Sequence, residues 1–368
     1  MASHSNSDRV TRLFGTLPGN VDVVALSPGE TLRYFTGLKM HKSERPTLVF
    51  LFRDGSPVVV HPELEGDRIE ESLPDAERYT YEDATDPVIA AQGAFERLTD
   101  ERTIPEPIGA EFRSTRLLER EVFAPDGEEV VDVENAVAAV RSRKDDGEIE
   151  RMRTAVEIIE GIFQDVFELI EPGMTEIDIE TEIKKRVMES DADAYGVGIV
   201  TSGERTAHAH ANTGSRAVED GDLVMIDAGV IYEGYYSDIT RTVAVGEPES
   251  ELVEIYNVVQ EAAAAARDCV EPGVEFQEID RAARTVIEDA GYGEYFPHRV
   301  GHGLGLEGHE PPYLVEGNDG TLEPGHAVTV EPGIYVPGLG GVRIEDDVVV
   351  TEDGSAVLST SSRDLRIL

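Results

Sequence analysis

The second part of the chain repeats one order of elements, and this repeat limits the possible folds more than any other feature. A stripe of apolar residues at steps of three and four from Ile149 to Ile170 predicts a long helix. It leads to Glu171-Pro172-Gly173 and then to Glu176-Ile177-Asp178. The same order returns at Glu271-Pro272-Gly273 and Glu278-Ile279-Asp280. Copies of this length are too long for a solenoid. We therefore predict one domain with pseudo-twofold symmetry and a site where its halves meet.

Each copy continues with a histidine-bearing segment and an apolar strand that ends in a carboxylate. The two strand carboxylates are Asp227 and Glu331, and each follows four mainly apolar residues, where a solvated surface acid is not expected. A second carboxylate follows in each copy, Asp238 and Glu345. If the strands pair around the intervening turn, Asp238 lies opposite Gly229, which shares a strand face with Asp227. The carboxylates of one copy then project in the same direction.

Carboxylates that converge in apolar surroundings cannot all remain ionised without cations. Two divalent metal ions would resolve this, and His302 in Gly301-His302-Gly303 completes the donor set. One imidazole among carboxylates suits Mn²⁺ or Co²⁺, and it would also accept Zn²⁺ or Fe²⁺. The predicted metal ligands are Asp227, Asp238, His302, Glu331 and Glu345.

The length of 368 residues suggests two domains. The apolar runs 47–52 and 57–60 read as a strand hairpin, which places an α/β unit in the first part of the chain. The charged stretch 141–147 marks a boundary. We predict an N-terminal α/β domain at 7–140 and a second domain at 141–368.

The chain carries 75 acidic and 32 basic residues, a formal net charge of −43, and the acids are spread along its whole length. Such a charge disfavours nucleic acid and anionic membranes as partners. In dilute buffer it would also destabilise the compact state by self-repulsion, whereas about 1 M salt shortens the Debye length to ~3 Å. We therefore expect a protein from a halophile that works in molar salt.

This expectation predicts that the midpoint of thermal unfolding rises with KCl concentration. Screening of the surface carboxylates should stabilise the folded state progressively up to about 2 M salt. A midpoint that stays flat or falls over that range would contradict the halophile interpretation.

The sequence also bears on location. The chain contains no apolar run close to the roughly 18 residues that a membrane span needs. Its start lacks the basic and apolar parts of a secretory signal, and its single cysteine, Cys269, cannot form an internal disulfide. We expect a cytoplasmic protein.

Several motifs resemble those of a known family, the pita-bread metallopeptidases, and within it most closely the prolidases and aminopeptidases P. The motifs that carry the resemblance are Asp227-Ala228-Gly229, Ser237-Asp238-Ile239-Thr240-Arg241-Thr242, Gly301-His302-Gly303-Leu304-Gly305, Glu331-Pro332-Gly333-Ile334-Tyr335 and Arg343-Ile344-Glu345-Asp346-Asp347. The resemblance implies an α+β protein with a C-terminal pseudo-twofold pita-bread catalytic domain and a smaller, creatinase-like N-terminal α/β domain. It also implies that Asp238 and Glu345 bridge two metal ions, that Asp227 binds one ion, and that His302 and Glu331 bind the other.

Further roles follow from the same resemblance. Glu331 would act as general base, His210 would position the substrate, and His309 would stabilise the oxyanion. Arg343, two residues before Glu345, would share its strand face and could hydrogen-bond the carboxylates or the substrate. His208 and His298 are weaker candidates.

The preference for proline rests on the resemblance alone, which implies short proline-containing peptides as substrates. Some prolidases carry an arginine soon after the residue that corresponds to His309, and a dipeptide's free carboxylate needs a cation. The stretch Glu310-Pro311-Pro312-Tyr313-Leu314 has no arginine. We therefore expect an Xaa-Pro aminopeptidase rather than a strict Xaa-Pro dipeptidase.

Functions outside the Xaa-Pro peptidases are open to different degrees. A related small-amide hydrolase would share the same motifs. A metal-free binding module of the same fold is disfavoured, since all five ligand positions are intact, and methionine aminopeptidases usually lack an N-terminal domain. Members of the family often dimerise, so we expect a homodimer.

Overall fold

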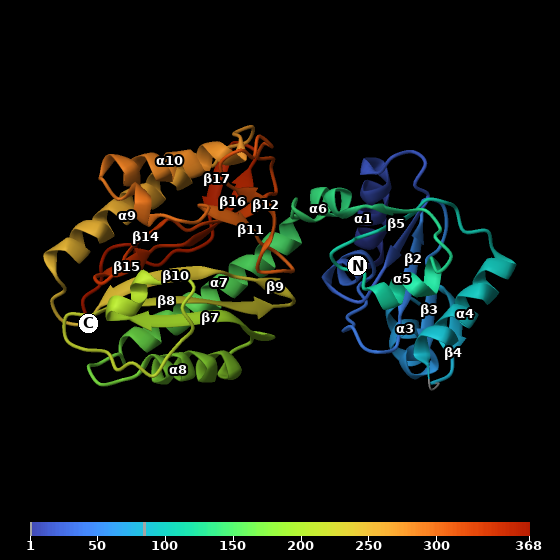
Figure 1. Ribbon diagram of the computed structural model, residues 1–368, viewed down its shortest axis with the longest axis horizontal. Coiled ribbons are helices and arrows are strands. Elements are labelled where there is room, and N and C mark those ends of the chain that lie inside the picture. The colour runs from blue at the N-terminus through green and yellow to red at the C-terminus, as the bar shows by residue number, and fades with distance from the viewer. Residues whose placement is uncertain (1, 84–85) are drawn as a thin grey trace. The chain divides into compact units, whose positions relative to one another are not determined.

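The computed structural model describes residues 2–83 and 86–368. The chain divides into two compact units, Met1–Arg141 and Ser142–Leu368 (Figure 1). Each unit has its own hydrophobic core. The two units are therefore described separately.

The N-terminal unit is built on a six-stranded mixed sheet in the order β4-β3-β2-β1-β5-β6. The strands β2 and β3 pair antiparallel, as the apolar runs predict, whereas β3–β4, β1–β5 and β5–β6 are parallel pairs. The strands are β1 Val23–Leu26, β2 Leu48–Phe52, β3 Val58–Pro62, β4 Glu77–Tyr81, β5 Ile108–Ala110 and β6 Val130–Asp132.

Helices pack around this sheet. The side chain of Asp86 caps α4 by accepting hydrogen bonds from the amides of Val88 and Ile89. Phe50 of β2 packs against Phe95 of α4 and Phe123 of α5 in the core. The helices are α1 Ala2–Thr16, α2 Glu30–Thr36, α3 Gly66–Ser72, α4 Pro87–Glu101, α5 Leu117–Phe123 and α6 Glu134–Arg141, with a 3₁₀ turn at Glu63–Glu65.

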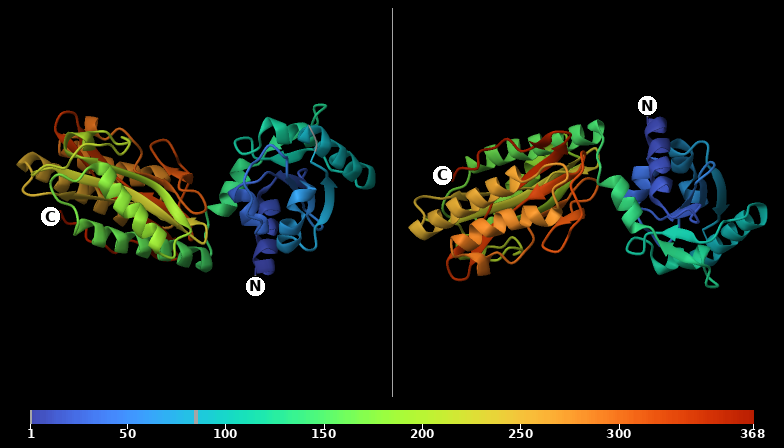
Figure 2. Two further views of the ribbon diagram at one scale, coloured as in Figure 1. Left: turned by 90° about the horizontal axis from the view of Figure 1, so that it is seen from below. Right: turned by 90° about the horizontal axis from the view of Figure 1, so that it is seen from above.

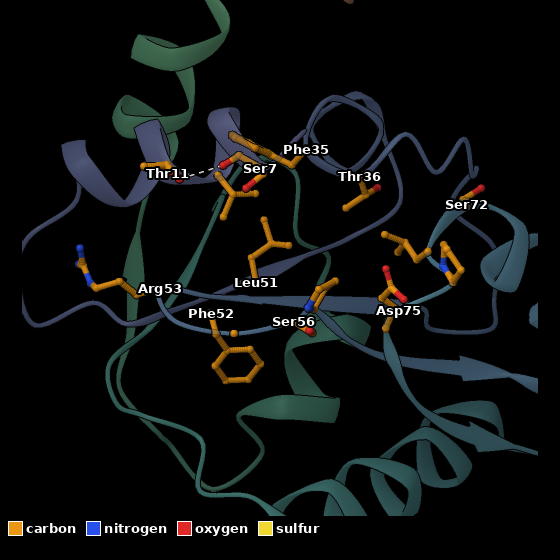
Figure 3. Close-up of a pocket in the computed structure, with 16 residues that line it drawn as sticks. Ser7, Thr11, Phe35, Thr36, Leu51, Phe52, Arg53, Ser56, Ser72 and Asp75 are labelled. Carbon is orange, nitrogen blue, oxygen red and sulfur yellow. Dashed lines mark hydrogen bonds between the residues drawn. The ribbon is translucent and has the colours of Figure 1, made fainter. Parts of the chain in front are cut away.

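This unit contains a cavity of about 500 Å³ beside α1, the end of α2 and the β2–β3 turn (Figure 3). Phe35, Leu51 and Phe52 form apolar parts of its wall. Arg53 also lines it, and its guanidinium donates to Asp22 and to backbone carbonyls, including that of Val21. None of the residues nominated by the sequence lines this cavity, so the candidate site lies elsewhere.

The C-terminal unit contains the two copies predicted from the repeat. Figures 1 and 2 show its strands between the α7–α8 pair and the α9–α10 pair. The first copy comprises α7 Asp146–Phe167, α8 Glu176–Glu189, β7 Ala194–Ser202, β8 Leu223–Tyr232, β9 Tyr235–Tyr236 and β10 Ile239–Ala244. The second comprises α9 Ser250–Asp268, α10 Phe276–Asp289, β11 Gly301–Gly303, β12 Glu310–Leu314, β13 Ala327–Val330, β14 Gly333–Val336, β15 Gly340–Arg343, β16 Asp346–Thr351 and β17 Gly354–Val357. Short 3₁₀ turns lie at Gly203–Ala207 and Gly293–Tyr295.

The repeated Glu-Pro-Gly turns have a common backbone reason. Gly173 and Gly273 have φ angles of 100° and 86°, in the left-handed region that favours glycine. In the first copy, Thr175 then caps α8 and accepts a hydrogen bond from the amide of Asp178. Each turn therefore ends one helix and directs the chain into the next.

The two copies are joined between β10 and β15. The Thr242 hydroxyl donates to the carbonyl of Arg343, and the amide of Glu345 donates to the carbonyl of Thr240. The carboxylate-bearing ends of both strand pairs consequently meet at this junction, where the repeat predicts the site.

Candidate metal centre

Strand register brings the predicted carboxylates together. In the first copy, Ile239 pairs with Ala228, so the preceding residue, Asp238, lies beside Gly229. A Cβ atom at Gly229 would lie 1.8 Å from the carbonyl oxygen of Ser237, so this close approach requires glycine. The sequence prediction for this strand pair therefore agrees with the observed register.

The second copy reaches the same result by two ladders. Val330 of β13 pairs with Asp346 of β16, and Gly333 of β14 pairs with Arg343 of β15. Both registers place Glu331 opposite Glu345, where the chain passes from one ladder to the next.

Ligand atoms of the predicted residues lie close enough to share metal ions. Among the residues that the structure describes, three groups have potential ligand atoms within 4.8 Å of one another. The groups are Asp227, Asp238 and Glu345; His302, Glu331 and Glu345; and Asp238, His302 and His309. The structure thus places all five predicted ligands in one continuous cluster, and it adds His309.

The electrostatics of Asp238 and Glu345 point to bound cations. Burial raises the pKa of both carboxyls well above the ordinary value, and each raises the pKa of the other together with Asp227 and Glu331. Without cations these two groups would hold protons at neutral pH. Hard divalent ions fit the donor set because they would offset the carboxylates' mutual repulsion in place of those protons.

Glu331 differs from the two bridging candidates. Burial alone would raise its pKa, but the hydrogen bond from His302 and the charges of His302 and Arg343 lower it to about 2. The Glu331 carboxylate lies 3.2 Å from His302 Nε2 and accepts a 3.3 Å hydrogen bond from Thr329 Oγ1. Glu331 therefore remains ionised, as a metal ligand or general base requires.

A hydrogen-bond network orients the cluster. Arg343 donates through Nη2 to Asp227, through Nη1 to the Tyr335 hydroxyl at 2.9 Å, and through Nε to Thr240 Oγ1 at 3.1 Å. Thr240 Oγ1 in turn donates to Glu345 at 2.6 Å. Arg343 thus links carboxylates of both copies. Tyr335 and Thr240 were not nominated from the sequence, although both lie inside motifs that carry candidate ligands.

The histidines lie on one side of this cluster. The rings of His302 and His309 stack with their centroids 3.8 Å apart, and His302 Nδ1 lies 3.0 Å from the carbonyl oxygen of Gly303. That contact leaves His302 Nε2 free to face Glu331. Partial shielding of the His309 ring from solvent and the nearby His302 lower the pKa of His309. A neutral His309 can donate a hydrogen bond without carrying charge.

Two other histidines approach from separate loops. The structure places His210 and His208 in exposed positions, and the backbone carbonyl of the intervening Ala209 accepts a 3.3 Å hydrogen bond from Arg343. His298 is half-buried, and its Nε2 lies 2.9 Å from the Tyr335 hydroxyl. Burial lowers the pKa of His298, and the nearby charge of His210 contributes. His298, a weak candidate from sequence, therefore lies within the site network.

The raised pKa values predict how the metal-free protein responds to pH. Folded Asp238 and Glu345 hold protons that the unfolded chain loses near pH 4, so the free energy of unfolding should fall as pH rises above about 4. Urea unfolding in a chelator at constant high salt should give a slope less steep for Asp238→Asn by up to about 1.4 kcal/mol per pH unit. The exposed control Asp353→Asn should keep the wild-type slope. Identical slopes for Asp238→Asn and the wild type would contradict this prediction.

No helix within the described part of the chain is both long and apolar enough to cross a membrane.

Comparisons with known proteins agree with this geometry. The family model described as metallopeptidase family M24 matches residues 150–352, and the model of the creatinase/prolidase N-terminal domain matches residues 19–143. An Xaa-Pro dipeptidase of Lactobacillus delbrueckii subsp. lactis is 36% identical over 356 residues, which cover 95% of each chain.

Solved structures extend the similarity to the whole fold. An Xaa-Pro dipeptidase from Bacillus anthracis superposes with a TM-score of 0.90 at 32% identity, covering 99% of this chain and 100% of the other. An X-Pro aminopeptidase from Thermotoga maritima gives a TM-score of 0.83 at 30% identity, covering 98% and 100%. The predicted α+β fold, with a pita-bread domain after a smaller creatinase-like domain, is confirmed. The chain therefore belongs to the M24 metallopeptidases, a family that uses dinuclear divalent metals, and lies close to the Xaa-Pro dipeptidases.

Proposed function

We propose that this protein is an Xaa-Pro dipeptidase that hydrolyses the peptide bond before proline. The sequence by itself favoured an aminopeptidase, because no arginine lies in the stretch after His309. Relatives named as Xaa-Pro dipeptidases, which match nearly the whole chain, support the dipeptidase instead.

One observation in the site carries this choice. The guanidinium of Arg299 lies over the ring of Tyr313, 4.2 Å from its centroid. Tyr313 pairs across β11 and β12 with His302, a candidate metal ligand, and the charge of Arg299 contributes to lowering the pKa of His309. A cation therefore lies next to the candidate site although the stretch that contains Tyr313 lacks one. We propose that Arg299 binds the free carboxylate of the dipeptide.

The donor set would hold two divalent ions, for which we propose Mn²⁺ or Co²⁺. When bound, such ions polarise the scissile carbonyl and lower the pKa of water. Asp238 and Glu345 would bridge the ions, Asp227 would bind one of them, and His302 and Glu331 would bind the other.

The remaining chemistry belongs to side chains of this chain. Glu331 would accept the proton of the attacking water and pass it to the proline nitrogen, which has no proton of its own and leaves as a secondary amine. His309, as a neutral donor, would hydrogen-bond the carbonyl oxygen as negative charge develops on it. His210 would contact the substrate from its exposed loop. Arg343 would keep Asp227 and, through Thr240, Glu345 in their orientations.

The test compares three substrate classes with Mn²⁺- or Co²⁺-loaded protein in concentrated KCl. We expect higher kcat/KM for Xaa-Pro dipeptides than for Xaa-Pro-Xaa tripeptides, and no cleavage of peptides that begin with methionine and lack proline. A preference for tripeptides would restore the aminopeptidase interpretation. Cleavage of the methionine-initiated peptides alone would replace both.

Replacing Arg299 with alanine tests the carboxylate contact. We expect KM for an Xaa-Pro dipeptide to rise about tenfold, because a charge-assisted hydrogen bond to the substrate is lost. Hydrolysis of the corresponding dipeptide amide, which has no terminal carboxylate, should be unaffected. Arg281→Ala, which removes an exposed arginine of α10, is the matched control. An equal loss for dipeptide and amide would exclude this role for Arg299.

A further inference from the structure

We propose that two buried carboxylate–arginine pairs, Glu176–Arg205 and Asp280–Arg284, are positioning devices that hold the histidine segments of the substrate site. Each copy of the repeat supplies one pair. The proposal rests on the proposed function for its kinetic consequence, but its structural consequence can be measured without substrate.

Glu176 anchors both ends of the loop that carries His210. Its side chain is 0% exposed, and its carboxylate accepts hydrogen bonds from the amides of Ser202 and Gly214, each at 2.8 Å. It also accepts from Arg205 Nε at 3.1 Å. A single buried carboxylate therefore connects the start and the end of the loop.

The loop itself is tied at inner points, whereas its tip is exposed. Arg205 Nη2 donates to the carbonyl of Asn212 at 2.6 Å, and the Thr206 hydroxyl accepts from the amide of Gly341 at 2.7 Å. A Cβ at Gly214 would lie 2.9 Å from Arg205 Nη2 and 3.1 Å from Glu176 Oε2, so the backbone must pass close to the pair. The position of the exposed His210 consequently depends on this buried base.

Asp280 acts on the corresponding segment of the second copy. It is 1% exposed and accepts hydrogen bonds from Arg284 Nε at 2.8 Å and from the amide of Val300 at 2.9 Å. Arg284 donates to the carbonyls of Phe296 and His298, at 3.0 Å and 2.9 Å. This pair therefore fixes the backbone on both sides of His298, next to Arg299.

The two devices converge on one space. Both carboxylates lie in the helix that follows the Glu-Pro-Gly turn, α8 in one copy and α10 in the other. The segments that they hold bring His210 near enough to His298 for its charge to act on that ring. A buried charge is unfavourable unless it is fully hydrogen-bonded, and apolar residues could fill the same volume. Precise placement of groups that contact substrate gives these charges a purpose that packing does not supply.

Hydrogen exchange of the full-length protein tests the structural consequence. In Glu176→Gln we expect faster amide exchange in residues 203–214 and unchanged exchange in residues 296–300, and in Asp280→Asn we expect the reverse. Glu160→Gln, which alters a buried carboxylate of α7 that accepts from the amides of Thr360 and Ser361, should affect neither segment. Equal changes throughout the unit, or no change in either segment, would overturn the proposal.

Kinetics separate this proposal from the proposed function. If the wild type cleaves Xaa-Pro dipeptides, both variants should raise KM about tenfold while kcat changes by no more than about twofold. Unchanged KM and exchange in an active enzyme would overturn the positioning role alone. An inactive wild type that still shows the segment-specific exchange would overturn the proposed function alone. If Glu176→Gln does not fold, Arg205→Met removes only the arginine contact and should give the same pattern in residues 203–214.

Discussion

Replacement of Asp238 or Glu345 by alanine is expected to abolish metal binding and turnover together. Both residues lie in the carboxylate cluster, where each raises the pKa of the other, and the register of each strand pair directs them toward the junction of the two copies. Loss of one bridging carboxylate removes a ligand from both proposed ions. We expect turnover of an Xaa-Pro dipeptide to fall by at least a factor on the order of 10³.

The measurement is metal content by elemental analysis after gel filtration, combined with initial rates in excess Mn²⁺. Glu160→Gln, a buried carboxylate outside the cluster, should keep both ions and its activity. Near-normal turnover of either alanine variant with two ions bound would show that the metal-ligand assignment is wrong.

Replacement of Glu331 by glutamine is expected to lower kcat by about 10²–10⁴, the range attributed to a general acid–base group. Glutamine retains an oxygen that can face His302 and a metal ion, but it cannot carry a proton from water to the leaving nitrogen. Because the Glu331 pKa lies at about 2, the wild-type carboxylate is ionised throughout the neutral range and available as a base.

Rates must be measured at saturating metal, since glutamine is also a weaker ligand. If high Mn²⁺ restored full activity, Glu331 would be a ligand only and the proton transfer would belong to another residue. Glu331→Asp, which keeps the carboxylate on a shorter side chain, should recover part of the lost rate. His309→Ala is not a substitute for this test because it removes a hydrogen-bond donor and leaves the base intact.

Local patterns in the sequence were sufficient for the cluster of candidate ligands. Apolar strands that end in Asp227 and Glu331 indicate buried carboxylates, and the two-residue period of a strand places Asp238 beside Gly229. The repeat further indicates that two such sets meet at one place. These inferences need only the spacing of residues within short segments, and they survive because the register of each strand pair follows from its turn.

Contacts between distant segments depended on the path of the whole chain. Arg343 lies near Glu345 in sequence, but its partner Asp227 belongs to the other copy, and His298 reaches the site through Tyr335. Likewise, Glu176 holds a loop that begins more than twenty residues later. No local pattern identifies such partners.

Substrate length illustrates the same division. The sequence by itself determined that the stretch around Tyr313 lacks an arginine, and that absence favoured an aminopeptidase. Only the tertiary structure decided that Arg299, from the segment before β11, lies over the Tyr313 ring next to His302. The physical reason is that strand pairing, not chain neighbourhood, determines which charges share a pocket wall.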